Sequence, residues 1–311
     1  MAEIVITEFM SAQAVARLEE NHAVLYDPGL ADRQREIPAV VQGCRALIVR
    51  NRTQVNDHLL ARADKLECVG RLGVGLDNIE VEACKARGIA VYPATGANNL
   101  SVAEYVITSA MMLLRGAYQS NAAMIAGQWP RQSLMGRELS GKTLGLVGFG
   151  AIAQETARKA SALGMKIVAH DPFLPESHPA WRTVEHLSLA ALLSVSDVVS
   201  LHVPLTDETR HQIDADALKL MKKDSVLINA ARGGVVDEAA LADALHQGKL
   251  GGAALDVFER EPLDAAHGKR FEGLNNLILT PHVAGVTVES NVRVSDLIAD
   301  LVLGHLGNGK A

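Results

Sequence analysis

The chain has 311 residues, of which 48% are hydrophobic and 21% charged, and its formal net charge is −6. This length is enough to bury a large core and favours two domains. The acidic balance argues against nucleic acid or an anionic membrane as a general partner, but it leaves room for a local basic pocket that binds a small anion.

The cysteines and the N-terminus favour a cytoplasmic protein. Cys44, Cys68 and Cys84 are odd in number and show no CxxC spacing, so we expect reduced structural thiols and no metal site. The N-terminal MAEIVITEFM has an early acid and no long apolar region, which predicts a strand and no signal peptide. No apolar run approaches the length of a membrane span.

The first hundred residues alternate short strands with helices and predict a complete small α/β unit. The expected strands are Ile4–Thr7, Val24–Tyr26, Ala46–Val49, Cys68–Arg71 and Ala90–Tyr92. The expected helices are Ala12–Glu20, Asn56–Ala63 and Asn78–Arg87.

Two loops of this unit follow strands directly, at the edge where α/β sheets bind ligands. Arg50 comes after one strand, and Arg71 ends another in Gly70-Arg71-Leu72-Gly73-Val74-Gly75. Gly73 and Gly75 could leave consecutive backbone N–H groups free to bind an anion, with the two arginines supplying charge. Either arginine alone is more often a solvated surface residue.

A long helix at Asn99–Arg115 leaves the first unit, and residues 116–140 form an irregular arm of the kind that commonly packs on a partner subunit. A second α/β unit follows. Its expected strands are Thr143–Val147, Lys166–His170, Val198–Leu201, Ser225–Asn229, Gly252–Asp256 and Leu277–Thr280. Its expected helices are Ser188–Leu193, Ala215–Met221 and Glu238–Gln247. A last amphipathic helix at Val286–Leu306 could return to the first unit and make that domain discontinuous.

A glycine motif between two strands of the second unit predicts a dinucleotide site. Gly148-Phe-Gly150-Ala-Ile-Ala153 follows a buried strand and opens a helix, whose N-terminus would face phosphates. Gly148 permits the tight turn, and Gly150 lets the backbone approach a pyrophosphate. Asp171 ends the next strand, where its carboxylate can bind both ribose hydroxyls and repel a 2′-phosphate. We therefore expect NAD and not NADP.

Three polar residues follow three consecutive strands and should reach the same sheet edge as the glycine loop. They are Arg232, Glu261 and His282. Hydride transfer to or from an alcohol carbon needs a proton carrier, which His282 could be, and a group that orients it, which Glu261 could be. Arg232 could hold a carboxylate and polarise the neighbouring carbonyl. Any one of the three alone is more often a surface residue, but the ordered set favours a dehydrogenase.

These runs resemble the D-2-hydroxyacid dehydrogenase family along nearly the whole chain. The resemblance is carried by the glycine loop with Asp171, by NAARGGVVD around Arg232, by DVFEREP around Glu261, and by TPH at His282. It implies Arg232, Glu261 and His282 as the catalytic set. The residues that it implies to contact NAD are Gly148, Gly150, Ala151 and Ile152 of the glycine motif, Asp171, Ala230, Ala231 and Asp256, and also Arg232 and His282 of the catalytic set.

The resemblance also implies two Rossmann-like, doubly wound parallel sheets and a homodimer. A flavodoxin-like substrate or lid domain would comprise residues 1–98 plus 285–311, and a Rossmann NAD-binding domain would comprise 99–284. The substrate carboxylate would bind the N–H groups of Val74 and Gly75.

The first half of the chain is similar to phosphoglycerate and (S)-sulfolactate dehydrogenases of this family. In the former, arginines placed like Arg50 and Arg71 face a phosphate, and Arg52 is a further candidate here. We expect a substrate with a second anion at C3, with 3-sulfolactate first and 3-phosphoglycerate second. Two alternatives stay open: a generalist 2-ketoacid reductase, and an NAD(H)-sensing corepressor, a binding protein that keeps the same residues.

Overall fold

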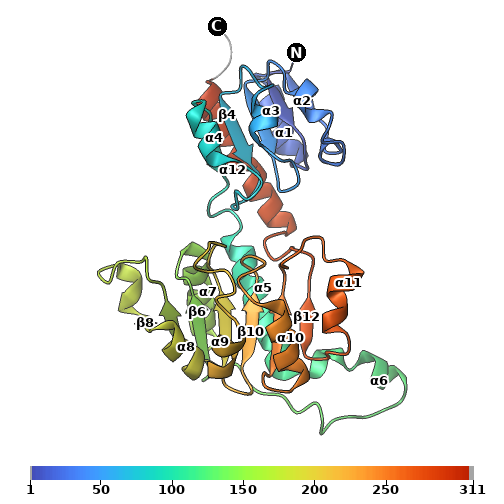
Figure 1. The fold of residues 1–311 in the computed structure, drawn as a ribbon, viewed down its shortest axis with the longest axis vertical. Helices are drawn as coiled ribbons and strands as arrows, with labels where there is room; N and C mark the ends of the chain where they lie inside the picture. The colour runs from blue at the N-terminus through green and yellow to red at the C-terminus, as the bar shows by residue number, and fades with distance from the viewer. Residues whose placement is uncertain (1, 308–311) are drawn as a thin grey trace. The chain divides into compact units, whose positions relative to one another are not determined.

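The computed structural model describes residues 2–307, whose contacts divide the chain into two compact units. Unit 1 contains the residues up to Asn98 and those from Val286 onward, and unit 2 contains Asn99–Gly285. Each unit has one parallel sheet with helices packed on it (Figure 1). The predicted class, α/β with two doubly wound parallel sheets, is therefore confirmed.

The strands of unit 1 are β1 (Ile4–Ile6), β2 (Val24–Tyr26), β3 (Ala46–Val49), β4 (Cys68–Arg71) and β5 (Ala90–Pro93). They lie in the order β2-β1-β3-β4-β5, and every pair is parallel. This is the flavodoxin-like order, in which the strand order reverses between β1 and β3. The loops after β1 and β3 therefore meet at the point where such sheets bind ligands.

The helices of unit 1 are α1 (Ala12–Glu19), α2 (Ile37–Val40), α3 (Asp57–Leu60), α4 (Val81–Ala86) and α12 (Val288–Leu306), with a 3-10 turn η1 at Leu30–Asp32. Successive strand residues face opposite sides of the sheet, so each face has its own core. Ile4, Ile6 and Ile48 pack with α1 and α12, whereas Val5 and Leu47 pack with α2 and α3.

The last helix crosses β4 at a glycine. A Cβ at Gly70 would lie 2.7 Å from Cγ2 of Ile298 and 3.2 Å from Cγ2 of Val302. A larger residue would push α12 away from the sheet, so Gly70 allows the close contact. A capping box of Thr287 and Ser290 fixes where the helix begins. The C-terminal helix thus belongs to the core of unit 1.

Unit 2 contains seven parallel strands in the order β12-β11-β10-β9-β6-β7-β8. The strands are β6 (Thr143–Val147), β7 (Lys166–His170), β8 (Glu185–His186), β9 (Val198–Leu201), β10 (Val226–Asn229), β11 (Gly252–Leu255) and β12 (Leu277–Leu279). The strand order reverses between β6 and β9, as in dinucleotide-binding sheets. The glycine motif follows β6 and therefore lies at that reversal.

Helices cover both faces of this sheet. The helices are α5 (Asn99–Arg115), α6 (Asn121–Ile125), α7 (Ala151–Ala162), α8 (Leu189–Val195), α9 (Ala215–Leu220), α10 (Glu238–His246) and α11 (Ala265–Gly268), with 3-10 turns η2 (Ala117–Gln119), η3 (Pro179–Arg182) and η4 (Lys269–Phe271). Leu227 and Leu255 pack with α8, α9 and α10, while Ile228 and Ala254 pack with α5 and α7. Strands buried on both faces explain why their sequences are continuously apolar.

Two helices of unit 1 are shorter than predicted. The pattern over residues 56–63 gives only α3, which ends at Leu60, and the pattern over 78–87 gives a helix that starts at Val81. Asn78 instead joins the loop after β3, where its Nδ2 donates to the carbonyl of Thr53 at 2.6 Å and its carbonyl accepts the N–H of Val55 at 2.8 Å. These contacts satisfy its polar groups outside a helix.

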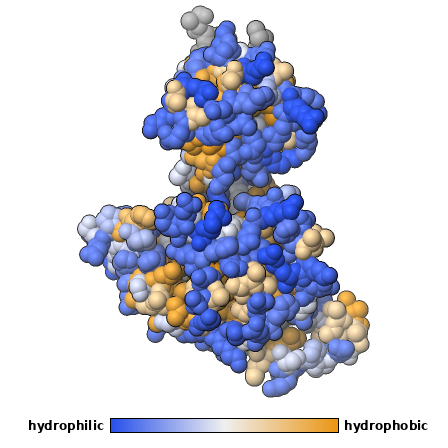
Figure 2. Space-filling view, in the orientation of Figure 1, coloured by the Kyte–Doolittle hydropathy of each residue, from blue (hydrophilic) through white to orange (hydrophobic). Residues whose placement is uncertain are grey.

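The segment from 116 to 140, predicted to be an irregular arm, contains the short η2 and α6. Hydrophobic residues gather on it, and Figure 2 shows them over α6 at the lower right. The exposed members are Tyr118, Met124, Ile125, Trp129 and Met135. Exposed apolar surface of this kind marks an interaction site more often than a solvated loop.

The three cysteines are buried and form no disulfide. Burial raises the pKa of the Cys44 and Cys68 thiols to about 12, as expected for structural thiols. Among residues 2–307, no helix has the length and apolar character needed to cross a membrane.

Candidate active site

The glycine motif forms the turn between β6 and α7. Gly148 has a φ of 86°, and a Cβ there would lie 2.6 Å from the carbonyl oxygen of His202. Gly150 is the N-cap of α7, and no side chain among residues 2–307 caps that end of the helix. Within the described chain, nothing lies within 4 Å of where a Gly150 Cβ would be. The loop is therefore closed behind Gly148 and open beside Gly150.

This geometry fits a dinucleotide. The first N–H groups of a helix have no partner within it, and those of α7 include Ala151 and Ile152. They lie beside the open space at Gly150, where a pyrophosphate could approach the backbone and meet the positive end of the helix. These residues could thus hold the phosphates without any charged side chain.

Asp171 lies immediately after β7 and ties the glycine loop to the loop that follows. Its Oδ2 accepts the N–H of Phe149 at 2.8 Å, and its Oδ1 accepts those of Phe173 and Leu174 at 2.9 and 3.1 Å. A carboxylate can accept about four hydrogen bonds, so it retains capacity for ribose hydroxyls. The contact of Asp171 with ribose stays a prediction. Its hydrogen bonds to the two loops were not predicted from the sequence.

We expect Asp171→Asn to lower the ratio of kcat/KM with NAD to that with NADP by about 10- to 100-fold, because it removes a charged acceptor for ribose and the repulsion of a 2′-phosphate. Steady-state kinetics with both cofactors measures the ratio. Asp197→Asn is a matched control, since Asp197 accepts the N–H of Thr143 at the opposite end of β6. An equal loss with both cofactors would mean that Asp171 only holds the loop.

His282 and Glu261, predicted to form a pair, are in contact. Nδ1 of His282 lies 2.7 Å from Oε2 of Glu261, whose Oε1 accepts the N–H of Phe258 at 3.0 Å. The His282 side chain is 46% exposed, and its contact with Glu261 uses Nδ1, which leaves Nε2 as the candidate atom for proton transfer. A base whose ring is oriented by a carboxylate is a common arrangement in enzyme active sites, and His282 with Glu261 has this arrangement.

The charges around Glu261 favour its ionised form. Burial alone would raise its pKa, but hydrogen bonds from His282 and the Phe258 N–H, with the charges of His282 and Arg232, outweigh it and leave the pKa lowered. The structure therefore brings Arg232 within electrostatic range of the pair. An ionised Glu261 can stabilise the imidazolium that a proton carrier must form.

A buried network that the sequence did not reveal holds the His282 loop. Asp256 is 1% exposed, and its carboxylate accepts the N–H groups of Val283 and Ala284, both at 2.8 Å. Thr280 Oγ1 donates to the same carboxylate at 2.6 Å and lies 2.7 Å from the hydroxyl of Tyr105 on α5. Asp256, which the family resemblance implied as an NAD contact, thus has a side chain committed to this loop.

The same network explains an unusual backbone. His282 has a φ of 55°, in the left-handed region, and its N–H donates to the carbonyls of Asp256 (2.8 Å) and Thr280 (3.1 Å). Histidine tolerates that region better than most residues, but it still costs energy. The hydrogen bonds of Asp256 supply the compensation, and the ring is aimed by the backbone as well as by Glu261.

Arg232 lies in a loop that Asn229 shapes at the end of β10. Asn229 is 1% exposed, accepts the N–H of Ala231 at 3.1 Å and donates to the carbonyl of Arg232 at 2.9 Å. The guanidinium donates to the carbonyl of Ala231 at 2.6 Å. Ala230 and Ala231 thus lie at the same sheet edge as the glycine loop, as predicted, and contact with NAD stays a prediction for both.

In unit 1, the arginines after β3 differ in their partners. Arg50 is partly buried, and its Nη2 donates to the neutral Oδ1 of Asn291 at 2.9 Å. Arg52 instead forms ion pairs with Asp32 and, at 3.8 Å, with Glu8. Arg50 is therefore the better candidate for binding a substrate anion, and Arg52 is compensated within the protein.

The loop after β4 requires one correction. Gly73 was predicted to offer a free N–H, but that group donates to the carbonyl of Arg71 at 2.7 Å. Its own φ of 150° and the approach of the Arg71 guanidinium leave no room for a side chain. Among the contacts that the structure describes, the N–H groups of Val74 and Gly75 have no acceptor in the protein. An anion could thus bind Val74 and Gly75, but not Gly73.

The strand reversal at the glycine motif and the residues gathered at that edge define a nicotinamide-dependent oxidoreductase. The family model described as "D-isomer specific 2-hydroxyacid dehydrogenase, NAD binding domain" matches residues 107–284, over half the chain. The chain belongs to the D-2-hydroxyacid dehydrogenase family, and unit 2 carries its NAD-binding domain. The predicted family, enzyme class and cofactor are confirmed.

The chain is similar along nearly its whole length to individual dehydrogenases of this family. The chain is 56% identical over 308 residues to (S)-sulfolactate dehydrogenase of Chromohalobacter salexigens, which covers 99% of both proteins. It is 38% identical to D-3-phosphoglycerate dehydrogenase of Methanocaldococcus jannaschii, over 97% of this chain and 57% of that protein. A crystal structure of D-lactate dehydrogenase from Aquifex aeolicus, complexed with NAD and lactic acid, matches with a TM-score of 0.83 at 27% identity, covering 98% and 96% of the two chains.

Proposed function

We propose that this enzyme oxidises (S)-3-sulfolactate to 3-sulfopyruvate with NAD, reversibly. The observation that carries the proposal is the 56% identity, over nearly the full length of both chains, to a protein of that activity. A sulfonate is a tetrahedral anion at C3, beside the carboxylate common to all 2-hydroxy acids. The substrate therefore needs two anion-binding sites.

The residues of unit 2 would carry the chemistry. NAD, when bound, supplies the acceptor for the hydride that leaves C2. His282 would take the hydroxyl proton as the C–O bond becomes a carbonyl, and would return it in the reverse direction. Glu261 would stabilise the resulting imidazolium, and Arg232 would hold the C1 carboxylate and polarise the C2 oxygen. A 2-hydroxy acid and NAD thus give a 2-keto acid, NADH and one proton.

The residues of unit 1 would bind the two anions of the same substrate. The N–H groups of Val74 and Gly75 suit the carboxylate, because no acceptor within the described protein uses them. Arg50 suits the sulfonate, because its guanidinium donates to the neutral amide of Asn291. Arg71 is a second candidate for the sulfonate. Residues 1–98 plus 285–311 would then be the substrate domain, and 99–284 the NAD-binding domain.

3-Phosphoglycerate is the second candidate, because the arginines would also suit a phosphate and because relatives of that activity share most of the chain. Initial rates of NAD reduction with (S)-sulfolactate, 3-phosphoglycerate, D-lactate and D-glycerate separate the candidates. We expect kcat/KM to be highest with (S)-sulfolactate among the four substrates. A preference for the small acids would indicate a generalist enzyme, and no turnover with tight NADH binding would favour a corepressor-like protein.

The enzyme would act as a homodimer in the cytoplasm. Its free buried thiols suit a reducing compartment, and the exposed apolar residues of the arm suit burial against a second copy. Light scattering after size exclusion should give twice the chain mass of 33.1 kDa. Ile125→Lys, on an 88% exposed residue, should shift the mass toward that of one chain, whereas Val195→Lys on α8 should not. A wild-type mass of one chain would refute the dimer.

A further inference from the structure

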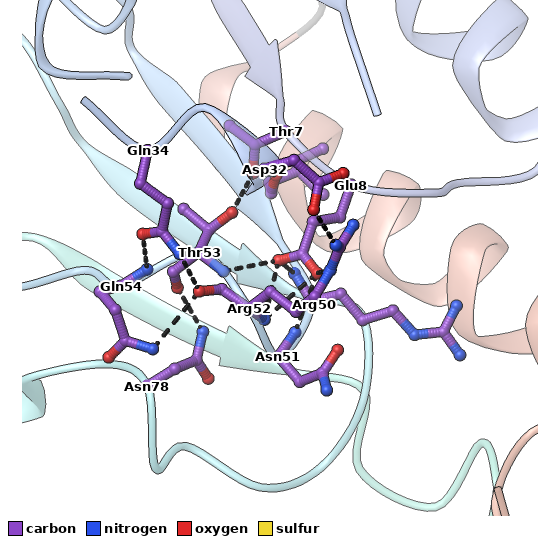
Figure 3. Close-up of polar contacts among 11 residues, drawn as sticks. Thr7, Glu8, Asp32, Gln34, Arg50, Asn51, Arg52, Thr53, Gln54 and Asn78 are labelled. Atoms are coloured by element: carbon purple, nitrogen blue, oxygen red, sulfur yellow. Dashed lines mark hydrogen bonds and ion pairs between the residues drawn. The ribbon is translucent and has the colours of Figure 1, made fainter. Parts of the chain in front are cut away.

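A buried carboxylate occupies the centre of the loop that presents Arg50. Glu8 follows β1, at the strand reversal of the unit 1 sheet, and is 2% exposed. Figure 3 shows its side chain pointing into the turn formed by residues 50–53 after β3. No sequence pattern marks this contact, because Glu8 and the turn are more than forty residues apart.

Four consecutive backbone N–H groups converge on this carboxylate. Oε1 accepts those of Arg50, Arg52 and Thr53 at 2.9, 3.2 and 3.0 Å. Oε2 accepts those of Asn51 and Arg52 at 3.4 and 3.2 Å. Successive N–H groups that point inward form an anion-binding nest, and here the protein fills that nest itself. A substrate anion therefore cannot use these backbone donors.

Three side chains from two other segments fix the outside of the turn. Gln34 donates to the carbonyl of Arg52 at 2.6 Å, and Asn78 donates to that of Thr53 at 2.6 Å. The Arg52 guanidinium pairs with Asp32. The N–H groups of the turn, the carbonyls of Arg52 and Thr53 and the Arg52 guanidinium are thus occupied within the protein, so Arg50 is the cation of the turn that suits a ligand anion.

Glu8 also acts on Arg50 electrostatically. Burial lowers the pKa of Arg50, and the nearby Glu8 carboxylate offsets part of that effect by favouring the charged form. The Arg50 backbone is held by Glu8 and its guanidinium by Asn291, so both ends of the residue are fixed. A fixed arginine loses less conformational entropy when it binds an anion.

We propose that Glu8 is a positioning residue for recognition of the substrate's second anion and that it acts through Arg50. The inference rests on the proposed function, since it concerns how the enzyme binds the anion at C3 of the substrate. Its carboxylate fills the nest, closes the backbone donors to substrate and holds Arg50 in place. The simpler alternative is that Glu8 stabilises unit 1 without any bearing on substrate choice.

A double-mutant cycle with Glu8→Gln and Arg50→Ala distinguishes these alternatives. Glutamine matches glutamate in shape, but its NH2 group would face the N–H groups of the turn and leave donors unsatisfied. We expect Glu8→Gln to lower the ratio of kcat/KM for (S)-sulfolactate to that for D-lactate by about tenfold, mainly through the KM for sulfolactate. In the Arg50→Ala background the same change should alter that ratio by less than about twofold.

Glu67→Gln is the matched control, because Glu67 is an ion-paired carboxylate of the same unit, bonded to Arg45 at 2.6 Å. It should leave the ratio unchanged. If Glu8→Gln does not fold, Glu8→Asp keeps the charge but withdraws it from the turn, and the ratio should fall by a smaller factor. An equal loss with both substrates, or a full Glu8→Gln effect without Arg50, would overturn the proposal.

Amide hydrogen exchange gives a readout that needs no substrate. Exchange of the amides of residues 50–53 should accelerate in Glu8→Gln and stay slow in Arg50→Ala, because only the first change replaces one of their two acceptor oxygens with a donor. Unchanged exchange in Glu8→Gln would overturn the positioning role. A wild-type enzyme without preference for sulfolactate or phosphoglycerate would refute the proposed function itself, whereas a preference that survives Glu8→Gln would overturn only this inference.

Discussion

Replacing His282 by alanine should lower kcat by about 10²- to 10⁴-fold, the usual contribution of a positioned general acid or base. The affinity for NADH should change little, because the ring contacts Glu261 while the loop is held by Asp256. Stopped-flow or steady-state rates give kcat, and titration of NADH fluorescence gives the affinity. A loss of less than about tenfold would contradict the role of proton carrier.

The left-handed backbone of His282 calls for a second variant. Alanine at a φ of 55° adds strain that has nothing to do with proton transfer, whereas asparagine tolerates that region. His282→Asn should therefore lose as much kcat as His282→Ala but less thermal stability. If the two variants differ in kcat instead, the loop geometry and not the imidazole would explain the loss.

His211 offers a matched control for this experiment. It is the other described non-glycine residue with positive φ (50°), and its Nε2 lies 3.1 Å from Oε1 of Glu259. Like His282, it thus has a left-handed backbone and a glutamate partner of its own, but it belongs to a surface loop of unit 2. His211→Asn should change kcat by less than about twofold.

The sequence predicted the parts of the fold that depend on local patterns. Buried parallel strands are continuous apolar runs, so β3, β6 and β9 were predicted with their observed bounds. The ends of parallel strands share one sheet edge, so the contact of Glu261 with His282 followed from chain order alone. Helix ends were less predictable, as Asn78 shows, because its side chain and its carbonyl bond to the loop after β3 and not within α4.

The rest depends on contacts between distant segments, which a single sequence does not display. Nothing local marks Glu8 as the centre of a turn or Asp256 as the support of the His282 loop. The prediction for Gly73 was wrong. Its N–H was expected to be free for an anion, but it donates to the carbonyl of Arg71, two residues earlier. Both acidic residues could have been suspected only from their place directly after buried strands.

Arg232→Lys should lower kcat/KM by about 10²- to 10³-fold while leaving NADH affinity nearly unchanged. Lysine keeps the positive charge that acts on Glu261, but it cannot hold a carboxylate with two parallel N–H donors or point a further donor at the C2 oxygen. Arg232→Ala loses the charge as well. The difference between the two variants therefore separates charge from the geometry of the guanidinium. Arg270→Lys is the matched control and should have no effect on kcat/KM, because the partly buried Arg270 pairs with Glu238 and Glu259 within the protein.

The choice of substrate makes this test specific. Every 2-hydroxy acid presents the same C1 carboxylate and C2 hydroxyl, so Arg232→Lys should reduce kcat/KM for sulfolactate and D-lactate by the same factor. Arg50 should behave oppositely, because it would contact a group that D-lactate lacks. If Arg232→Lys lowered kcat/KM for sulfolactate alone, Arg232 would bind the second anion and not the carboxylate. The C2 carbonyl would then lack its proposed polarising group.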